Sequence, residues 1–245
     1  MTSGSRTRAN SCGFLLTYEE DGCDNPRPHR MLALLPHCSV RRLRDLGADG
    51  IKILLSYTPF DDPSANDRKC AWIERIGNEC SPDMPFFLEP VGYDPAGLDP
   101  MSLEYAHRKP EIVTRSMEEF SKDIYKVDIL KVEFPVNSTY LNTAYSRQEV
   151  LDILQKADTV ARCPYIYLSA GVSNRQFIES LQLATEAKVR YSGVLCGRAT
   201  WQDGASAFAR HGQSAFEDWL ADQGVANITQ LNESLRSATP WSLWR

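Results

Sequence analysis

The sequence predicts an α/β protein built on a parallel sheet, because short strand-like segments alternate with longer helix-like segments along the chain. The chain has 245 residues, of which 42% are hydrophobic and 24% charged. This composition is typical of an ordinary globular protein and not of a disordered, fibrous or membrane protein. A chain of this length can bury a large core.

Six segments combine β-branched, aromatic and aliphatic residues in runs of strand length. They cover residues 13–18, 51–57, 85–89, 129–134, 165–169 and 193–197. The segments between them predict helices over residues 39–46, 67–79, 109–120, 146–161, 173–187 and 204–223, with a shorter tail helix over 227–237.

The spacing of the strands predicts the architecture. The six strands recur about every 36 residues, close to the roughly 31 residues of each βα unit in a TIM-type (β/α)8 barrel. Two more units would complete eight, and only 12 residues precede the first strand. We therefore expect one barrel domain over residues 13–245 that lacks the first two βα units, preceded by a disordered extension over residues 1–12.

Charge and hydropathy exclude several classes of partner. The formal net charge of −5 argues against nucleic acid as a bulk partner. The longest apolar run covers residues 31–35, far below the roughly 18 residues that span a bilayer. The first ten residues have no apolar stretch of the kind found in secretory signals. We expect a cytoplasmic protein.

The cysteine and histidine residues show no ligand spacing. The seven cysteines form no C-x-x-C pair, and the four histidines form no H-x-x-x-H or H-E-x-x-H pattern. We interpret the cysteines as reduced thiols and expect neither a metal site nor a cofactor.

Polar residues occupy alternate positions within the apolar strands, although buried parallel strands are usually apolar throughout. Side chains alternate between the two faces of a strand, so each strand carries its apolar set on one face and its polar set on the other. If the apolar face packs on helices, the polar set lines the barrel interior, and its last members lie at the carboxyl-end mouth, where barrel enzymes keep their chemistry. The polar set consists of Lys52, Glu89, Lys131, Glu133, Tyr165, Tyr167 and Ser169.

Two lysines on this face predict amine chemistry. Burial and like charge both lower the pKa of a lysine, and a neutral amine is a nucleophile towards a carbonyl. A nearby carboxylate can then move protons. The alternative interpretation is a set of buried ion pairs, or a lysine at a strand edge that reaches out to water.

Five strings of residues resemble one family closely, over about residues 12–243. The family is that of the tagatose 1,6-bisphosphate aldolases, which are metal-independent class I aldolases on a TIM barrel. The strings are residues 72–80 (WIERIGNEC), 85–89 (PFFLE), 130–137 (LKVEFPVN), 164–173 (PYIYLSAGVS) and 193–201 (GVLCGRATW).

The resemblance implies cleavage of tagatose 1,6-bisphosphate to dihydroxyacetone phosphate and glyceraldehyde 3-phosphate, with fructose 1,6-bisphosphate as a second substrate. The partner is then a phosphorylated ketose, and assembly into a homo-oligomer stays open. One alternative is a catalytically silent homologue that binds sugar phosphates or partners. Another is an aldolase for a sulfosugar phosphate, as in a related branch. Chains of the family begin about two βα units earlier, so residues 1–12 are expected to be an extension foreign to it.

The resemblance also implies roles for individual residues. Lys131 matches the lysine that forms the Schiff base, Glu89 the glutamate that donates and accepts protons, and Lys52 the strand lysine beside it. The residues that match the phosphate-holding loops are Ser169, Gly171, Gly197 and Arg198. The position of these loops also fits the fold, because phosphate sites in TIM-type barrels form after the last two strands.

Overall fold

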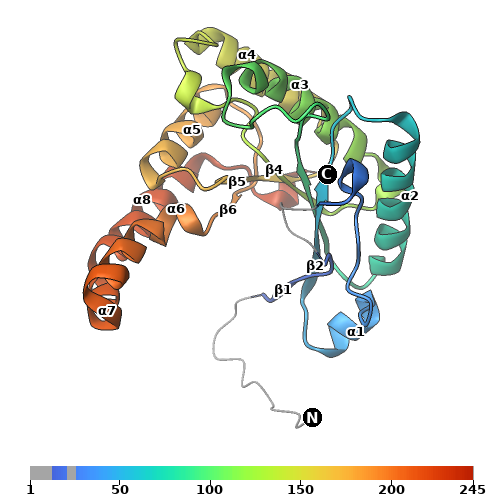
Figure 1. The fold of residues 1–245 in the computed structure, drawn as a ribbon, viewed down its shortest axis with the longest axis horizontal. Helices are drawn as coiled ribbons and strands as arrows, with labels where there is room; N and C mark the ends of the chain where they lie inside the picture. Colours follow the sequence, from blue (N-terminus) through green and yellow to red (C-terminus); the bar gives the residue numbers. More distant parts are fainter. Residues whose placement is uncertain (1–12, 21–25, 245) are drawn as a thin grey trace.

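The computed structural model describes residues 13–20 and 26–244 and contains six parallel strands in sequence order, β1-β2-β3-β4-β5-β6 (Figure 1). All six predicted strands are confirmed. Residues 1–12, the expected extension, lie outside the described residues. The strands are β1 (Leu15–Thr17), β2 (Gly50–Ser56), β3 (Phe86–Val91), β4 (Ile129–Val132), β5 (Tyr165–Leu168) and β6 (Val194–Leu195).

Helices lie around the outside of the sheet (Figure 1). They are α1 (Val40–Asp45), α2 (Pro63–Cys80), α3 (Leu103–Phe120), α4 (Arg147–Val160), α5 (Asn174–Glu186), α6 (Arg198–Trp201), α7 (Ala205–Trp219) and α8 (Val225–Ser234). A π-helical stretch, Leu220–Gly224, joins α7 to α8, and short 3-10 turns cover Pro28–Arg30, Asp123–Tyr125, Ser138–Tyr140, Gln202–Gly204, Leu235–Ser237 and Trp241–Leu243.

Two predicted helices begin earlier than the sequence pattern indicated. Helix α2 begins at Pro63 and not at residue 67, because Asp62 caps it and a proline is favourable in the first turn. Helix α3 begins at Leu103 and not at residue 109, because the side chain of Ser102 accepts a hydrogen bond from the backbone N–H of Tyr105. The helix continues through Pro110.

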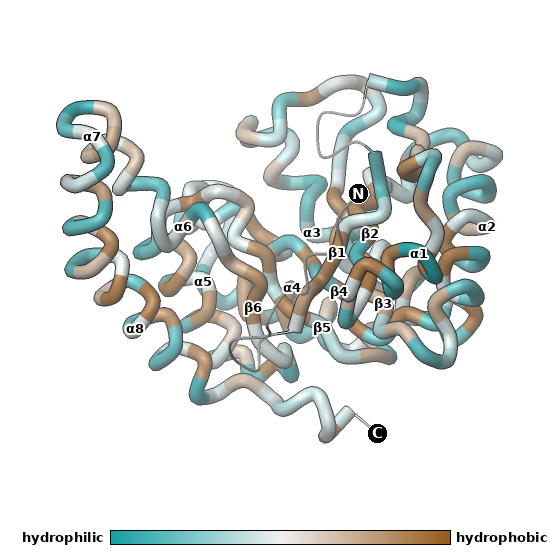
Figure 2. Tube along the Cα trace, turned by 90° about the horizontal axis from the view of Figure 1, so that it is seen from below, coloured by the Kyte–Doolittle hydropathy of each residue, from teal (hydrophilic) through white to brown (hydrophobic). Residues whose placement is uncertain are grey.

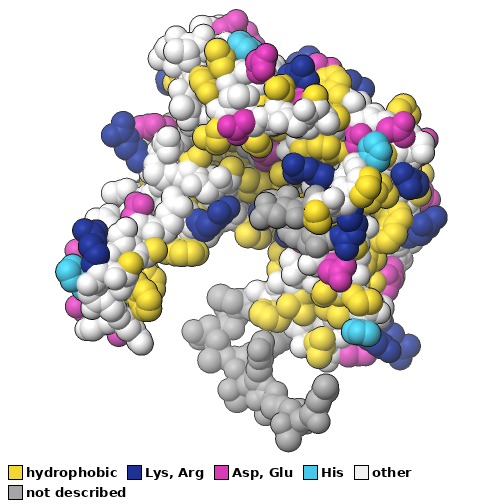
Figure 3. Space-filling model, viewed as in Figure 1, with side chains coloured by type: hydrophobic (Ala, Val, Ile, Leu, Met, Phe, Trp, Pro, Cys, Tyr) yellow, Lys and Arg dark blue, Asp and Glu magenta, His cyan; other side chains and the backbone are white. Residues whose placement is uncertain are grey.

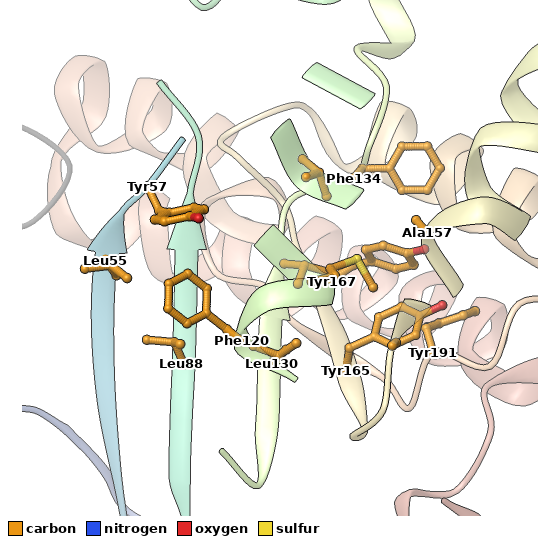
Figure 4. Close-up of a cluster of buried hydrophobic side chains, with 14 of the residues drawn as sticks. Leu55, Tyr57, Leu88, Phe120, Leu130, Phe134, Ala157, Tyr165, Tyr167 and Tyr191 are labelled. Atoms are coloured by element: carbon orange, nitrogen blue, oxygen red, sulfur yellow. The ribbon is translucent and has the colours of Figure 1, made fainter. Parts of the chain in front are cut away.

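The apolar parity of the first strands faces the helices, as predicted. Ile51, Ile53 and Leu55 of β2 are fully buried. Figure 4 shows Leu88 and Leu130, from β3 and β4, beside the ring of Phe120 from α3. This layer forms the core between sheet and helices, and it leaves the opposite face of β2, β3 and β4 for the polar set. Hydrophobic segments accordingly gather in the central strands, whereas the outer helices carry hydrophilic stretches (Figure 2).

The predicted parity of β5 was wrong. Tyr165 pairs in register with Leu130 and Tyr167 with Val132, so both tyrosines belong to the helix-facing layer. Both are 1% exposed, and the hydroxyl of Tyr165 donates to Asp158 of α4 at 2.9 Å. A tyrosine ring fills an apolar layer well when its hydroxyl finds a partner, and the sequence pattern does not reveal that partner.

The described sheet is open, because β1 and β6 each pair with one neighbour only. Figure 3 shows the molecule hollowed between the α6–α8 region and the β1–α1 region, with hydrophobic side chains on both sides. Phe14 and Leu195, at the two edges, are 42% and 41% exposed. The described strands therefore form an open parallel α/β sheet, and they do not close into a barrel. Within the same residues, no helix has the length and apolar character needed to cross a membrane.

Candidate active site

A carboxylate between two ammonium groups lies on the polar face of the sheet. Oε1 of Glu89 is 2.8 Å from Nζ of Lys131, and Oε2 is 3.0 Å from Nζ of Lys52. The three side chains belong to neighbouring strands, β3, β4 and β2, and are 9% to 14% exposed. The structure thus brings together the three residues that the sequence predicted as catalytic.

Strand register explains this contact. In β2 and β3, Lys52 pairs with Phe87 and Leu54 with Glu89, so Lys52 and Glu89 share the face opposite the helices. Parallel strands end at the same edge, which collects their last polar residues. The side chains are shielded from water but not sealed from it, as an active site requires.

The charge state of Lys52 differs from the sequence expectation. Burial lowers its pKa, but the attraction of Glu89 and Glu19 outweighs burial and raises the pKa above its usual value. Lys52 is therefore an ammonium at neutral pH. Glu89 and Glu19 lie within 3.0 Å of Nζ of Lys52, and their opposite charge raises the pKa of the lysine, whereas burial and a second lysine would lower it.

Glu19 is a site residue that sequence reasoning missed. It follows β1, its side chain is 4% exposed, and its Oε1 is 2.6 Å from Nζ of Lys52. The available signal was its parity: Glu19 is two residues beyond Thr17, the last residue of β1, which pairs with Lys52 in register. The row Glu19–Lys52–Glu89–Lys131 thus crosses four neighbouring strands with alternating charge.

Glu133 does not contact Lys131, although both residues share one parity. Its Oε1 is 3.2 Å from Nζ of Lys109 in α3, and its Oε2 accepts a hydrogen bond from the backbone N–H of Gly92 at 2.8 Å. A Cβ at position 92 would lie 2.8 Å from Ile112 and 3.2 Å from the Glu133 carboxylate, so only glycine fits there. Glu133 therefore anchors the loop that follows Glu89.

The predicted phosphate loops lie together after β5 and β6. Gly171 has a φ of +75°, and a Cβ there would lie 3.3 Å from the guanidinium carbon of Arg198. The side chain of Ser169 lies close enough to Cys196, the residue before Gly197, to affect the pKa of its thiol. Positive φ and close approach both favour glycine at position 171. The arrangement presents a guanidinium over a bare backbone, which suits an oxyanion.

A second polar cluster ties the loops of the first three strands. Lys69 of α2 is fully buried, donates to the hydroxyl of Tyr93 at 2.9 Å and lies 3.6 Å from Asp61. Asp61 also accepts from Tyr93 and contacts Nδ1 of His29 at 2.7 Å. Burial lowers the pKa of Lys69 to about 8. Tyr93 is four residues beyond Glu89, so this cluster supports the same loop as Glu133.

Metal ligands were not expected from the sequence. Among the residues that the structure describes, no three His, Cys, Asp or Glu side chains are grouped to hold a metal ion. The polar face instead offers amines, carboxylates and a guanidinium.

Fold and site together define an α/β protein with paired amine and carboxylate groups at the carboxyl edge of a parallel sheet. The model of the DeoC/LacD family aldolases matches residues 1–203. The chain is 44% identical over 245 residues to tagatose 1,6-diphosphate aldolase 2 of Enterococcus faecalis, covering 97% of this chain and 74% of that protein. It is 42% identical over 246 residues to tagatose 1,6-diphosphate aldolase 1 of Streptococcus pyogenes, covering 97% of this chain and 76% of that protein. The chain therefore belongs to the DeoC/LacD aldolase family, and it is an aldolase of the lyase class.

Solved structures agree with this fold. A fructose-bisphosphate aldolase from Plasmodium falciparum superposes with a TM-score of 0.58 at 13% identity, over 91% of this chain and 68% of that one. A Schiff-base-forming fructose-1,6-bisphosphate aldolase gives 0.51 at 17% identity, over 84% of this chain and 69% of that one. At such identities the likeness concerns the fold alone.

Proposed function

We propose that this protein is a class I aldolase that cleaves tagatose 1,6-bisphosphate to dihydroxyacetone phosphate and glyceraldehyde 3-phosphate. The observation that carries the proposal is the 2.8 Å contact between Lys131 and Glu89 at the carboxyl edge of the sheet. Lys131 is the nucleophile, Glu89 moves the protons, and Lys52 holds Glu89 in place. The choice of tagatose 1,6-bisphosphate as substrate follows from the relatives, which are tagatose 1,6-diphosphate aldolases with 42% to 44% identity to this chain.

The contact allows imine formation without an external base. Glu89 accepts a proton from the ammonium of Lys131, and the neutral amine attacks the C2 carbonyl of the ketose. The attacking nitrogen then passes a proton to the C2 oxygen, which gives a carbinolamine with a C2 hydroxyl. Glu89 returns its proton to this hydroxyl, which leaves as water. The product of these steps is a protonated imine on Lys131, and Glu89 is a carboxylate again.

The same carboxylate serves the bond cleavage. Glu89 takes the proton of the C4 hydroxyl, the C3–C4 bond breaks, and its electrons move into the imine. Glyceraldehyde 3-phosphate leaves and an enamine remains. Glu89 then protonates C3, and water hydrolyses the imine to release dihydroxyacetone phosphate and free Lys131.

Arg198 and Gly171 hold a substrate phosphate in this proposal. A guanidinium binds phosphate through charge-assisted hydrogen bonds, and Gly171 lets the backbone approach closely. Ser169 and Gly197 complete the loops beside them. Fixing the phosphate positions C2 for attack, because orientation supplies much of the rate in such reactions.

We also propose that the six strands are part of a (β/α)8 barrel, with two further parallel strands between β6 and β1. The exposed apolar side chains at both edges support this, because open hydrophobic edges are a liability in a sheet. The chain spans about three quarters of the length of the relatives it matches. The free cysteines fit a reducing compartment, and we place the reaction in the cytoplasm.

Borohydride trapping tests the catalytic proposal. Reduction in the presence of dihydroxyacetone phosphate should attach the ketone covalently to Lys131, as found by peptide mass mapping, and Lys131→Ala should not be labelled. Lys122→Ala, at a half-exposed lysine on the opposite end of the sheet, is the control and should be labelled like the wild type. An adduct on Lys52, with Lys131→Ala still labelled, would refute the assignment.

Substrate assays distinguish the sugars. The enzyme should cleave tagatose 1,6-bisphosphate, and also fructose 1,6-bisphosphate, which differs only in configuration at C4. Faster turnover of 6-deoxy-6-sulfofructose 1-phosphate than of either bisphosphate would reassign the substrate. Absence of both cleavage and trapping in a folded protein would make it a silent homologue.

A further inference from the structure

Glu19 is held by the backbone in a fixed position beside the catalytic row. The N–H of Tyr18 donates to the carbonyl of Lys52 at 3.1 Å, and Glu19 forms an antiparallel bridge with Leu34. The N–H of Glu20 donates to the carbonyl of Ala33 at 2.8 Å. The segment that carries Glu19 is thus tied on one side to β2 and on the other to the returning chain. This backbone cannot easily move Glu19 away from Lys52.

Two carboxylates share the ammonium of Lys52. Nζ is 2.6 Å from Glu19 and 3.0 Å from Glu89. Among the described residues, these two carboxylates are the titratable groups in contact with Lys52. Glu19 follows β1 and Glu89 lies in β3, the two strands beside β2. Nζ of Lys131 is 2.8 Å from the other oxygen of Glu89. Because the charges alternate along the row, the position and charge of each side chain depend on those of its neighbours in the row.

The two carboxylate oxygens of Glu19 differ in their surroundings. Oε2 is buried and has no hydrogen-bond partner. A buried, unsatisfied carboxylate oxygen costs folding free energy, so packing alone favours an apolar or amide side chain here. Local rules of this kind are broken mainly at functional sites. The 2.6 Å contact between Oε1 and Nζ of Lys52 is where the charge of Glu19 acts, and this contact belongs to the row.

We propose that Glu19 is a positioning residue of the aldolase reaction, which fixes Lys52 as a charged and immobile partner of Glu89 so that Glu89 stays in contact with Lys131. The proposal rests on the proposed function of Lys131 and Glu89. Glu19 acts through Lys52 and touches no reacting atom in the mechanism above. Without its charge, Lys52 moves towards Glu89 and competes with Lys131 for that carboxylate.

Kinetics of Glu19→Gln test this role. We expect kcat to fall by about 10- to 100-fold, because a misplacement of about 1 Å can cost a hundredfold. KM should stay within about threefold, since the phosphate loops follow β5 and β6, away from β1. The alkaline limb of the kcat profile should move to lower pH, because the attraction of Glu19 helps to raise the pKa of Lys52. Glu20→Gln, at the exposed neighbouring residue, is the matched control and should behave as wild type.

Glu19→Asp separates positioning from a structural role. This variant keeps the charge with a shorter side chain, so it should recover part of kcat and return the alkaline limb towards its wild-type position. If Glu19→Gln fails to fold, Glu19→Asp still tests the role of Glu19 through its kcat and pH profile. A fall in kcat with an unmoved limb, and no recovery in Glu19→Asp, would show a merely structural role and overturn the proposal. Wild-type kcat in folded Glu19→Gln would overturn it too.

Failure of the Glu19 proposal can be distinguished from failure of the proposed aldolase function. Borohydride trapping on Lys131 in the wild-type protein depends on the imine mechanism alone. If wild type is trapped and cleaves substrate while Glu19→Gln is unimpaired, only the role of Glu19 fails. If wild type is not trapped on Lys131, the proposed function fails first.

Discussion

Replacement of Glu89 by glutamine is the most direct test of the charge row. The variant keeps the size of the side chain and removes the carboxylate that lies 2.8 Å from Lys131 and 3.0 Å from Lys52. Lys131 and Lys52 contact different oxygens of Glu89, and a glutamine replaces one of these oxygens by an NH2 group, which cannot accept a hydrogen bond. The proton acceptor of the mechanism is lost at the same time.

The size of both effects follows from the site. A positioned general base contributes about 10²- to 10⁴-fold, so kcat should fall by that factor, or by about 3 to 5 kcal/mol in the barrier. Removing one partner of a fully buried ion pair costs roughly 3 to 5 kcal/mol. Here the side chains remain 9% to 14% exposed and Lys52 keeps Glu19, so we expect a loss of about 2 kcal/mol in unfolding free energy.

An NADH-coupled assay of released dihydroxyacetone phosphate measures the activity, and urea unfolding measures the stability. Glu118→Gln, at an exposed position on α3, is the control and should change neither quantity. A folded Glu89→Gln protein with kcat within tenfold of the wild type would refute the role of Glu89 as proton acceptor. Unchanged stability would refute the ion-pair argument separately.

Three further outcomes are expected. Burial lowers the pKa of Lys69 to about 8 in the folded protein, against 10.5 for an ordinary lysine. Between pH 8 and 10 the unfolded state therefore binds more protons, and the unfolding free energy should rise with pH by up to about 2 kcal/mol. Urea titrations should show this rise in the wild type and not in Lys69→Met. Gly77→Ala should lower the unfolding free energy by roughly 1 to 3 kcal/mol or more, because its Cβ would meet the backbone carbonyl oxygen of Tyr125 far inside van der Waals contact; an unchanged urea midpoint would contradict the close packing of α2. EDTA should leave cleavage unchanged, since the imine is the electron sink that a metal aldolase obtains from its Lewis acid; loss of turnover that zinc restores would contradict the Schiff-base mechanism.

Local sequence patterns are enough to predict the strands, most helices and the face that carries Lys52, Glu89 and Lys131. These features depend on local patterns: apolar runs of strand length, helical spacing between them, and the alternation of side chains with a period of two. The family motifs added the expected roles. The early starts of α2 and α3 were missed because an end cap, and not the apolar pattern, sets where those helices begin.

The contacts between charged side chains depend on the three-dimensional fold and cannot be predicted from those patterns. Glu89 and not Glu133 faces Lys131, Glu19 joins the row, and the tyrosines of β5 turn towards the helices. Register between neighbouring strands sets these contacts, and it joins residues that are more than 30 positions apart. Burial and neighbouring carboxylates then set the charge of Lys52, reversing the expectation from two lysines alone. A one-dimensional pattern gives the face of a strand, but distances between strands decide the electrostatics of the site.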